Sequence, residues 1–285
     1  MLSLGLHALA AAPEWRPDLW AAILPRMAAH GVSVIEIPLL RPAELDIAGT
    51  RALAAKHDVE LVCSLGLPAT LNVAERPDEA FDFIRVALEV TASAGATALS
   101  GVTFGVIGQT SGAAPTTREI DAMTRHVSRS AALAKKLGLR FGIEPCNRYE
   151  THLLNTGAAA RAVIERSGAD NAFIHLDTYH MNIEEVSHAQ GFADAGDLLG
   201  YVHLSESNRG VPGRGTVDWA NVFQGLKAAG FDGCAALESF VFVDADLASG
   251  LAIWRPVAEN PDDVIDVGFP FLRTAGEAAG LRWAR

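Results

Sequence analysis

The sequence lacks the features that identify several common protein classes. Its three cysteines, Cys63, Cys146 and Cys234, contain no CxxC pair, so they predict neither a thiolate zinc site nor a redox dithiol. An odd number of cysteines suits a reducing compartment, and we therefore expect a cytoplasmic location. No apolar run approaches the length of a membrane span, so we expect no membrane partner.

The chain also lacks an excess of positive charge. It has 23 basic and 34 acidic residues, and its formal net charge is −11. A protein that binds nucleic acid needs an extended basic face to contact the phosphates, and nothing here supplies one. The charge balance does not exclude a small neutral substrate.

What the sequence does contain is a regular alternation of strand-like and helix-like segments over 285 residues. Eight such units without a linker predict an α/β fold, a single (β/α)8 TIM barrel over residues 1–285 with its active site at the C-terminal ends of the strands. A doubly wound open sheet is the alternative, but no GxGxxG motif follows the first strand. The expected strands are 2–7, 32–37, 59–65, 97–102, 139–144, 172–177, 201–203 and 234–238.

Helix boundary signals accompany these strands. Pro17 is expected to open the first helix, with Leu19, Ile23 and Met27 on its core face. Thr116 and Glu119 predict a capping box at the start of a later helix.

Four potential metal ligands occupy equivalent positions at the ends of the last four predicted strands. Glu144, Asp177, His203 and Glu238 are roughly 30 residues apart, about the length of one strand-plus-helix unit. Consecutive parallel strands aim their ends at a common point, and buried carboxylates are costly there unless a cation balances them. Each residue alone has an ordinary explanation, such as a salt bridge or a core histidine, but the four together predict a metal site.

The ligand set indicates which metal to expect. Three carboxylates and one imidazole are hard, oxygen-rich ligands, which favour Mn²⁺ or Mg²⁺, with Co²⁺ possible, over a thiolate-type zinc site.

The segments around these residues carry a family resemblance. They read EPCNRYE at 144–150, HLDTYHMNIEE at 175–185, HLSESNRG at 203–210 and ESF at 238–240. With them, the chain resembles the D-tagatose 3-epimerase / D-allulose (D-psicose) 3-epimerase family, within the wider group of sugar isomerases similar to xylose isomerase. The similarity covers essentially the whole chain and is densest from 139 to 240.

The resemblance implies a metal-dependent ketose 3-epimerase. In the family, residues matching Glu144, Asp177, His203 and Glu238 hold a metal, commonly Mn²⁺, and those matching Glu144 and Glu238 lie on opposite faces of C3. One removes the C3 proton to give a cis-enediolate, and the other returns a proton from the far side. This division is chemically reasonable, because inverting a stereocentre needs an acid–base group on each face.

The resemblance also implies substrate contacts. Glu150, His180 and Arg209 match residues that position the sugar around O1 to O3, whereas surface salt bridges or a helix cap are the ordinary alternatives. Ser64 and Gly66 end an early strand and are expected to contact the sugar, with packing as the alternative. Contact with the sugar or an ordinary structural role likewise stays open for His7, Glu36, Trp15, Phe104 and Trp254.

Departures from the family leave the sugar preference open. The segments 8–12 and 104–116, together with Pro145 and Cys146, differ from many relatives and are expected near C4 to C6. The ketose is therefore of the D-tagatose, D-fructose/D-allulose or L-ribulose class. Relatives form dimers or tetramers, so a homodimer or homotetramer is expected.

Three other functions are weighed against epimerisation. An aldose–ketose isomerase uses the same barrel and related chemistry. A phosphoesterase of the AP-endonuclease type needs more histidine ligands and a basic face. A non-catalytic sugar-binding protein does not need the pair of acid–base carboxylates.

Overall fold

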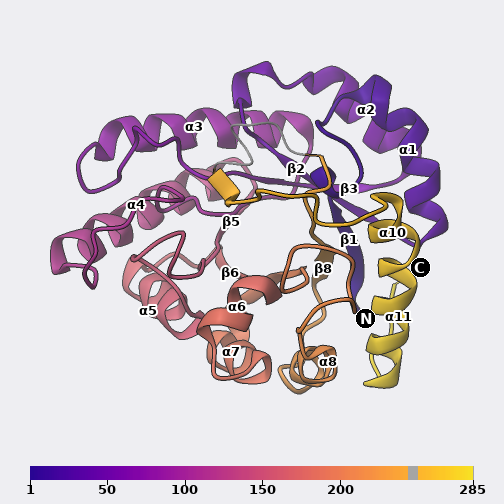
Figure 1. The fold of residues 1–285 in the computed structure, drawn as a ribbon. Helices are drawn as coiled ribbons and strands as arrows, with labels where there is room; N and C mark the ends of the chain where they lie inside the picture. The colour runs from indigo at the N-terminus through magenta and orange to yellow at the C-terminus, as the bar shows by residue number, and fades with distance from the viewer. Residues whose placement is uncertain (243–249, 285) are drawn as a thin grey trace.

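Eight parallel strands pair in chain order within residues 1–242 and 250–284, which the computed structural model describes (Figure 1). The last strand pairs back with the first, so the sheet closes into a barrel. This confirms the α/β fold and the (β/α)8 TIM barrel, and it excludes the open sheet. The strands are β1 (Ser3–His7), β2 (Val34–Pro38), β3 (Glu60–Ser64), β4 (Ala98–Ser100), β5 (Arg140–Ile143), β6 (Ala172–Asp177), β7 (Leu199–Leu204) and β8 (Cys234–Leu237).

The helices form a ring around the barrel, as Figure 1 shows, and cover its outer face. None of the helices in the described part of the chain is both long and apolar enough to cross a membrane. The helices are α1 (Pro17–Ala29), α2 (Ile47–His57), α3 (Pro77–Ala94), α4 (Thr117–Lys136), α5 (Gly157–Ser167), α6 (Thr178–Glu184), α7 (His188–Ala195), α8 (Trp219–Ala228), α10 (Asp262–Asp266) and α11 (Gly268–Ala278).

The predicted capping box is present at the start of α4. The Thr116 hydroxyl accepts from the backbone N–H of Glu119 at 3.2 Å, and the Glu119 carboxylate accepts from the Thr116 N–H at 2.8 Å. These bonds satisfy two donors that a helix start leaves without partners, which explains why the helix begins at this point.

The core face of α1 differs from the prediction. Pro17 opens the helix as expected, but the buried residues are Trp20, Leu24 and Met27, whereas Leu19 and Ile23 are only partly buried. The indole of Trp20 packs fully inside the core. The apolar period was therefore read correctly: Met27 is buried as predicted, and Leu19 and Ile23 pack against the core while staying partly exposed.

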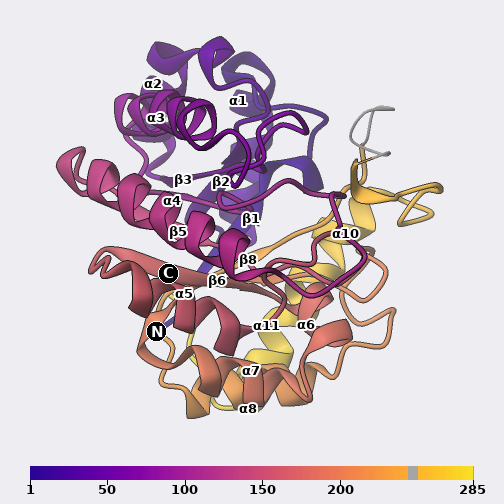
Figure 2. The ribbon, with the colours of Figure 1, turned by 90° about the vertical axis from the view of Figure 1, so that its left-hand side faces the viewer.

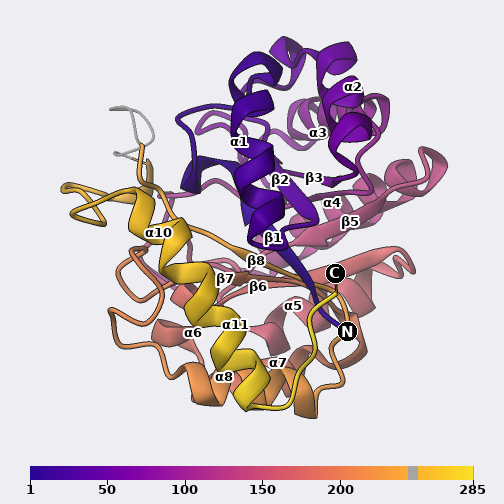
Figure 3. The ribbon, with the colours of Figure 1, turned by 90° about the vertical axis from the view of Figure 1, so that its right-hand side faces the viewer.

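The two ends of the barrel are formed by different parts of the chain. Helices α6 and α10 lie at one end, and both chain termini lie at the other (Figures 2 and 3). Because β6 runs directly into α6, the α6 end is the C-terminal end of the strands, where barrels of this type carry their sites.

Candidate active site

The four predicted metal ligands come from four consecutive strands and are buried together. Asp177 is the last residue of β6, and His203 lies in β7. Glu144 and Glu238 each follow the last residue of a strand, β5 and β8. The exposed fraction of each of the four residues is 7% or less. Backbone bonds from Glu144 N to Gly101 O and from Glu238 N to Leu204 O fix where the two glutamates leave the barrel.

The Nδ1 atom of His203 is the point on which the three carboxylates converge. It lies 3.2 Å from Oε1 of Glu238, 3.6 Å from Oε1 of Glu144 and 3.8 Å from Oδ2 of Asp177. Ligand atoms of Asp177, His203 and Glu238 all lie within 4.8 Å of one another, and Glu144 groups in the same way with His203 and His175. The structure thus brings together the four residues that the sequence singled out.

Two atoms of this cluster are buried and form no hydrogen bond within the described part of the chain. His203 Nδ1 and Asp177 Oδ2 have no hydrogen-bond partner among the described residues. An unpaired buried acceptor costs about 1–3 kcal/mol, so such atoms are rare unless a ligand uses them. Acceptors on one imidazole and three carboxylates fit a hard divalent cation.

Burial and charge push the pKa values of the two glutamates in opposite directions. Burial raises the pKa of Glu144, and the nearby negative charge of Glu238 adds to that effect. Burial would also raise the pKa of Glu238, but His203 and Arg209 outweigh it and hold the pKa well below its usual range. The two carboxyls thus lie in different electrostatic surroundings although both approach His203 Nδ1.

Arg209 lies on the far side of Glu238 from His203. Its Nη1 donates to Oε2 of Glu238 at 2.5 Å, and its Nη2 lies 3.5 Å from Oε1 of Glu150. The guanidinium also lies 4.1 Å from the centroid of the Tyr179 ring. Arg209 is 4% exposed and Glu150 is 8% exposed, so surface salt bridges are excluded for both.

The backbone of Arg209 is unusual. Its φ is +56°, in the left-handed region that side chains other than glycine rarely adopt, at a cost of about 1–3 kcal/mol. A buried carboxylate supports this conformation. Glu206 accepts hydrogen bonds from the backbone N–H groups of Ser207, Gly213 and Val217 and from the indole of Trp219, at 2.8–3.0 Å. The loop after β7 is thus built around one side chain.

The ring of His180 presents a defined donor to the site. The backbone N–H of Asn147 donates to Nδ1 of His180 at 3.1 Å, so the ring carries its proton on Nε2. Burial lowers the pKa of His180 well below its usual value, and the charge of Arg209 lowers it further, so the ring stays neutral. His180 lies inside α6, whose cap is Asp177, which excludes the capping role.

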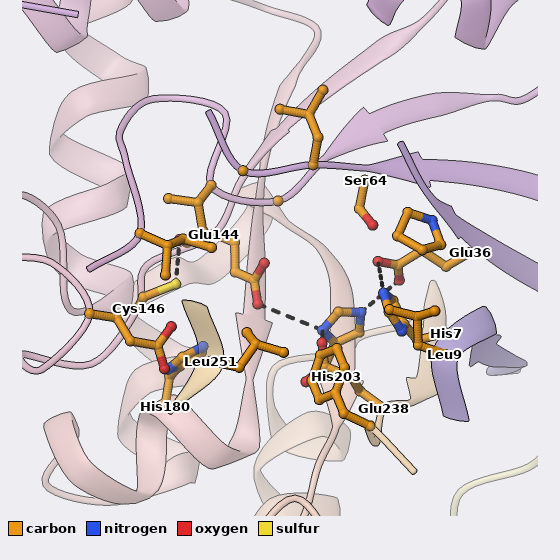
Figure 4. Close-up of a pocket in the computed structure, with 18 of the residues that line it drawn as sticks. His7, Leu9, Glu36, Ser64, Glu144, Cys146, His180, His203, Glu238 and Leu251 are labelled. Carbon is orange, nitrogen blue, oxygen red and sulfur yellow. Dashed lines mark hydrogen bonds and ion pairs between the residues drawn. The ribbon is translucent and has the colours of Figure 1, made fainter. Parts of the chain in front are cut away.

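Most of these residues line one pocket, drawn in Figure 4, together with Ser64 and Gly66; Asp177 is fully buried and does not line it. The residues described above that line the pocket are Glu144, Glu150, His180, His203, Arg209 and Glu238. Part of its wall is aliphatic, and Phe240 is the aromatic residue among those that line it. Two of the aromatic residues whose contact with the sugar was left open do not line this pocket: Phe104 is fully buried in the core, and Trp254 is 73% exposed. The aliphatic lining residues are Leu9, Leu40, Leu65, Val102, Ile107 and Leu251.

Sequence reasoning gave too little weight to one residue, Glu36. Its Oε2 lies 2.6 Å from Nε2 of His203, on the side of the ring away from the three carboxylates (Figure 4). The signal was available, because Glu36 is a lone acidic residue between Ile35 and Ile37 in a strand. A carboxylate in such a position is expected to point into the barrel and to need a partner there.

Comparison with known proteins places this architecture in a family. Residues 24–268 match the family of xylose isomerase-like TIM barrels. The chain belongs to this family.

Relatives within the xylose isomerase-like family cover nearly the whole chain. An L-ribulose 3-epimerase from Methylomonas sp. is 36% identical over 280 residues, which cover 95% of this chain and 97% of the relative. A ketose 3-epimerase from Arthrobacter globiformis is 36% identical over 239 residues, covering 81% of this chain and 82% of the relative. The crystal structure of a D-allulose 3-epimerase from Methylomonas sp., in complex with D-allulose, superimposes with a TM-score of 0.90 at 34% identity, covering 96% of this chain and 97% of that one.

Proposed function

We propose that this protein is a ketose 3-epimerase that acts on free ketoses of the D-tagatose, D-fructose/D-allulose and L-ribulose class. The observation that carries the proposal is the pair of buried carboxylates, Glu144 and Glu238, which approach the same nitrogen of His203 from β5 and β8. Relatives of 36% identity that are named L-ribulose 3-epimerase and ketose 3-epimerase support it.

The metal centre belongs to the same proposal. Glu144, Asp177, His203 and Glu238 would hold a divalent cation, with Mn²⁺ expected first and Mg²⁺ or Co²⁺ as alternatives. When bound, the cation supplies Lewis-acid polarisation of the C2 carbonyl and stabilises the negative charge that develops on it.

The two glutamates exchange the proton at C3. The C3–H is acidic only because it neighbours the carbonyl, so the base must be ionised and held against that carbon. The two carboxyls lie in different surroundings, because burial raises the pKa of Glu144 whereas His203 and Arg209 hold the pKa of Glu238 below its usual range. Removal by one carboxylate and delivery by the other inverts C3 through a cis-enediolate, and the roles exchange for the opposite epimer.

The surrounding residues orient the sugar in this proposal. Nε2–H of His180 and the Arg209 guanidinium donate to its oxygens, and Glu150 holds Arg209 in place through the 3.5 Å ion pair. Ser64 and Gly66 contact the sugar from β3 and the loop that follows it. The cytoplasmic location, the homodimer or homotetramer and the single domain over 1–285 stay predictions.

The decisive experiment incubates the protein with Mn²⁺ and a ketose panel in deuterated water. We expect D-fructose to give D-allulose, with deuterium at C3. Formation of aldoses with exchange at the carbon next to the new carbonyl would indicate an isomerase instead. Ketose binding without any exchange across the panel would indicate a sugar-binding protein.

A further inference from the structure

The environment of Glu36 needs an explanation that the proposed reaction does not give. Glu36 is 1% exposed and lies on β2, whereas its partner His203 lies on β7, across the barrel. A buried carboxylate is costly to desolvate, so a sequence is expected to keep one inside a barrel only where a specific partner needs it.

The two nitrogens of the His203 ring face different groups and can serve different functions. Nε2 faces Oε2 of Glu36 at 2.6 Å, and Nδ1 faces the carboxylates of Glu144, Asp177 and Glu238 at 3.2–3.8 Å. A neutral imidazole carries one proton, so a proton on Nε2 leaves the lone pair on Nδ1 free to bind a cation. The ionised carboxylate of Glu36 accepts that proton in a hydrogen bond and so selects this tautomer.

Among the described residues, no other group accepts a hydrogen bond from Nε2. The rings nearest to His203 are those of His175, Tyr201 and His7, which lie against it edge-on with centroids 4.0–5.8 Å away. His175 already uses its Nδ1 with Ser100 at 3.1 Å. Removing the Glu36 carboxylate would therefore leave the His203 ring without a group that fixes its proton.

We propose that Glu36 is a positioning residue for the metal centre, which fixes the tautomer and the orientation of His203 from the opposite side of the barrel. This inference rests on the metal site proposed above. Carboxylates that accept the second N–H of a ligating histidine typically change metal affinity by about 10- to 100-fold when they are removed. Glu36 also lies 3.9 Å from His7, so one carboxylate faces two histidines.

The test measures metal binding rather than turnover. Mn²⁺ is titrated calorimetrically into the metal-stripped wild type, Glu36→Gln and Glu36→Leu. We expect affinity to fall roughly 10- to 100-fold in Glu36→Leu and less in Glu36→Gln, which keeps an acceptor oxygen but loses the charge. The matched control is Glu60→Gln, on the neighbouring strand β3, where the carboxylate is exposed and accepts from Thr97 at 2.8 Å. Its Mn²⁺ affinity should match the wild type.

A second measurement does not depend on the stability of a variant. Nitrogen-15 spectra of the histidine rings in the wild type loaded with diamagnetic Mg²⁺ should show His203 protonated on Nε2 and not on Nδ1. A ring protonated on Nδ1 would overturn the proposal, as would affinities of both variants within about twofold of the wild type. If the variants bind Mn²⁺ normally while the wild type exchanges C3–H, this inference fails and the epimerase proposal stands. If affinity falls as expected but no ketose is exchanged, the epimerase proposal fails and the role of Glu36 stands.

Discussion

The two halves of the barrel contribute different chemistry to one pocket. The half from β5 to β8 and its loops carries the converging carboxylates, His203 and the Arg209 guanidinium. The half from β1 to β4 contributes Glu36, Ser64 and much of the aliphatic lining. All eight strands contribute to one barrel, but the two halves supply different kinds of side chain to the pocket. Most of the charged groups come from one half of the chain, and much of the aliphatic lining comes from the other.

The separation has a physical basis. Carboxylates that share one cation must lie within a few ångströms of each other, which adjacent strand ends achieve without distortion. The side of the pocket formed by β1–β4 does not have to hold carboxylates at such short distances, so its residues can vary with the substrate. Glu36 is the exception, because its contact with His203 connects the two halves.

Metal removal should have the largest effect, because it disables the β5–β8 half as a whole. We expect treatment with EDTA to reduce ketose exchange to background, and Mn²⁺ or Co²⁺ to restore it. Mn²⁺ at one hundred times its dissociation constant should also raise the free energy of unfolding by about 2.7 kcal/mol, measured by denaturant titration. Full activity in the presence of the chelator would break the assignment of a metal to this half.

Substitution of either acid–base carboxylate comes next. Glu144→Gln and Glu238→Gln should each lower kcat by about 10²- to 10⁴-fold, because the amide cannot exchange a proton with C3. Turnover is followed by chromatography of the epimers, and Glu165→Gln, whose exposed carboxylate pairs with Arg161, serves as the control. Near-normal kcat in either variant would contradict the proposed exchange of the C3 proton between the two faces.

A smaller loss of kcat/KM is expected when the guanidinium of Arg209 is replaced by the ammonium group of lysine. Arg209→Lys keeps the charge but loses the planar fork that contacts Glu238 and that we propose to contact the sugar. This should cost about 1.5–3 kcal/mol, or roughly 10- to 100-fold in kcat/KM. Arg214→Lys is the matched control, since Arg214 lies in the same loop and pairs with Asp263 at 2.7 Å. Equal kinetics for the two variants would show that Arg209 has no contact with the sugar.

The smallest effect on activity should come from a substitution in the β1–β4 half. Ile107→Val enlarges the pocket by one methyl group, which should change the ratio of kcat/KM for D-fructose and D-tagatose by roughly 10-fold. Deuterium exchange at C3 should persist, because no carboxylate is altered. Val186→Ala, at a site 96% exposed, should leave the ratio unchanged. Loss of exchange in Ile107→Val would show that the two halves are not separable.

The sequence predicted the barrel and the convergence of Glu144, Asp177, His203 and Glu238 because both follow from regular spacing. Four ligand-type residues at equivalent strand ends must meet once the strands are parallel and adjacent, and Glu144 and His203 do meet at 3.6 Å. The cap at Thr116 was predictable for the same reason, since it depends on residues three positions apart.

Features that depend on contacts distant in the chain were not predictable. The Glu36–His203 contact joins residues 167 positions apart, and no local pattern encodes it. The apolar period of α1 did not show that Trp20 would be buried more deeply than Leu19, because that depends on packing against the barrel. The aliphatic lining was missed for a similar reason, because whether Phe104 faces the pocket or the core depends on how the loop folds back.

The hydrogen bonds that Glu206 accepts have a consequence for recognition. A loop that holds its own shape loses little conformational entropy when a ligand arrives, so more of each contact's free energy remains for affinity. A free ketose is small and strongly hydrated, and it offers few apolar atoms to compensate for ordering a flexible segment. Fast, reversible binding of such a molecule therefore favours an Arg209 guanidinium that is already held in position before the ligand arrives.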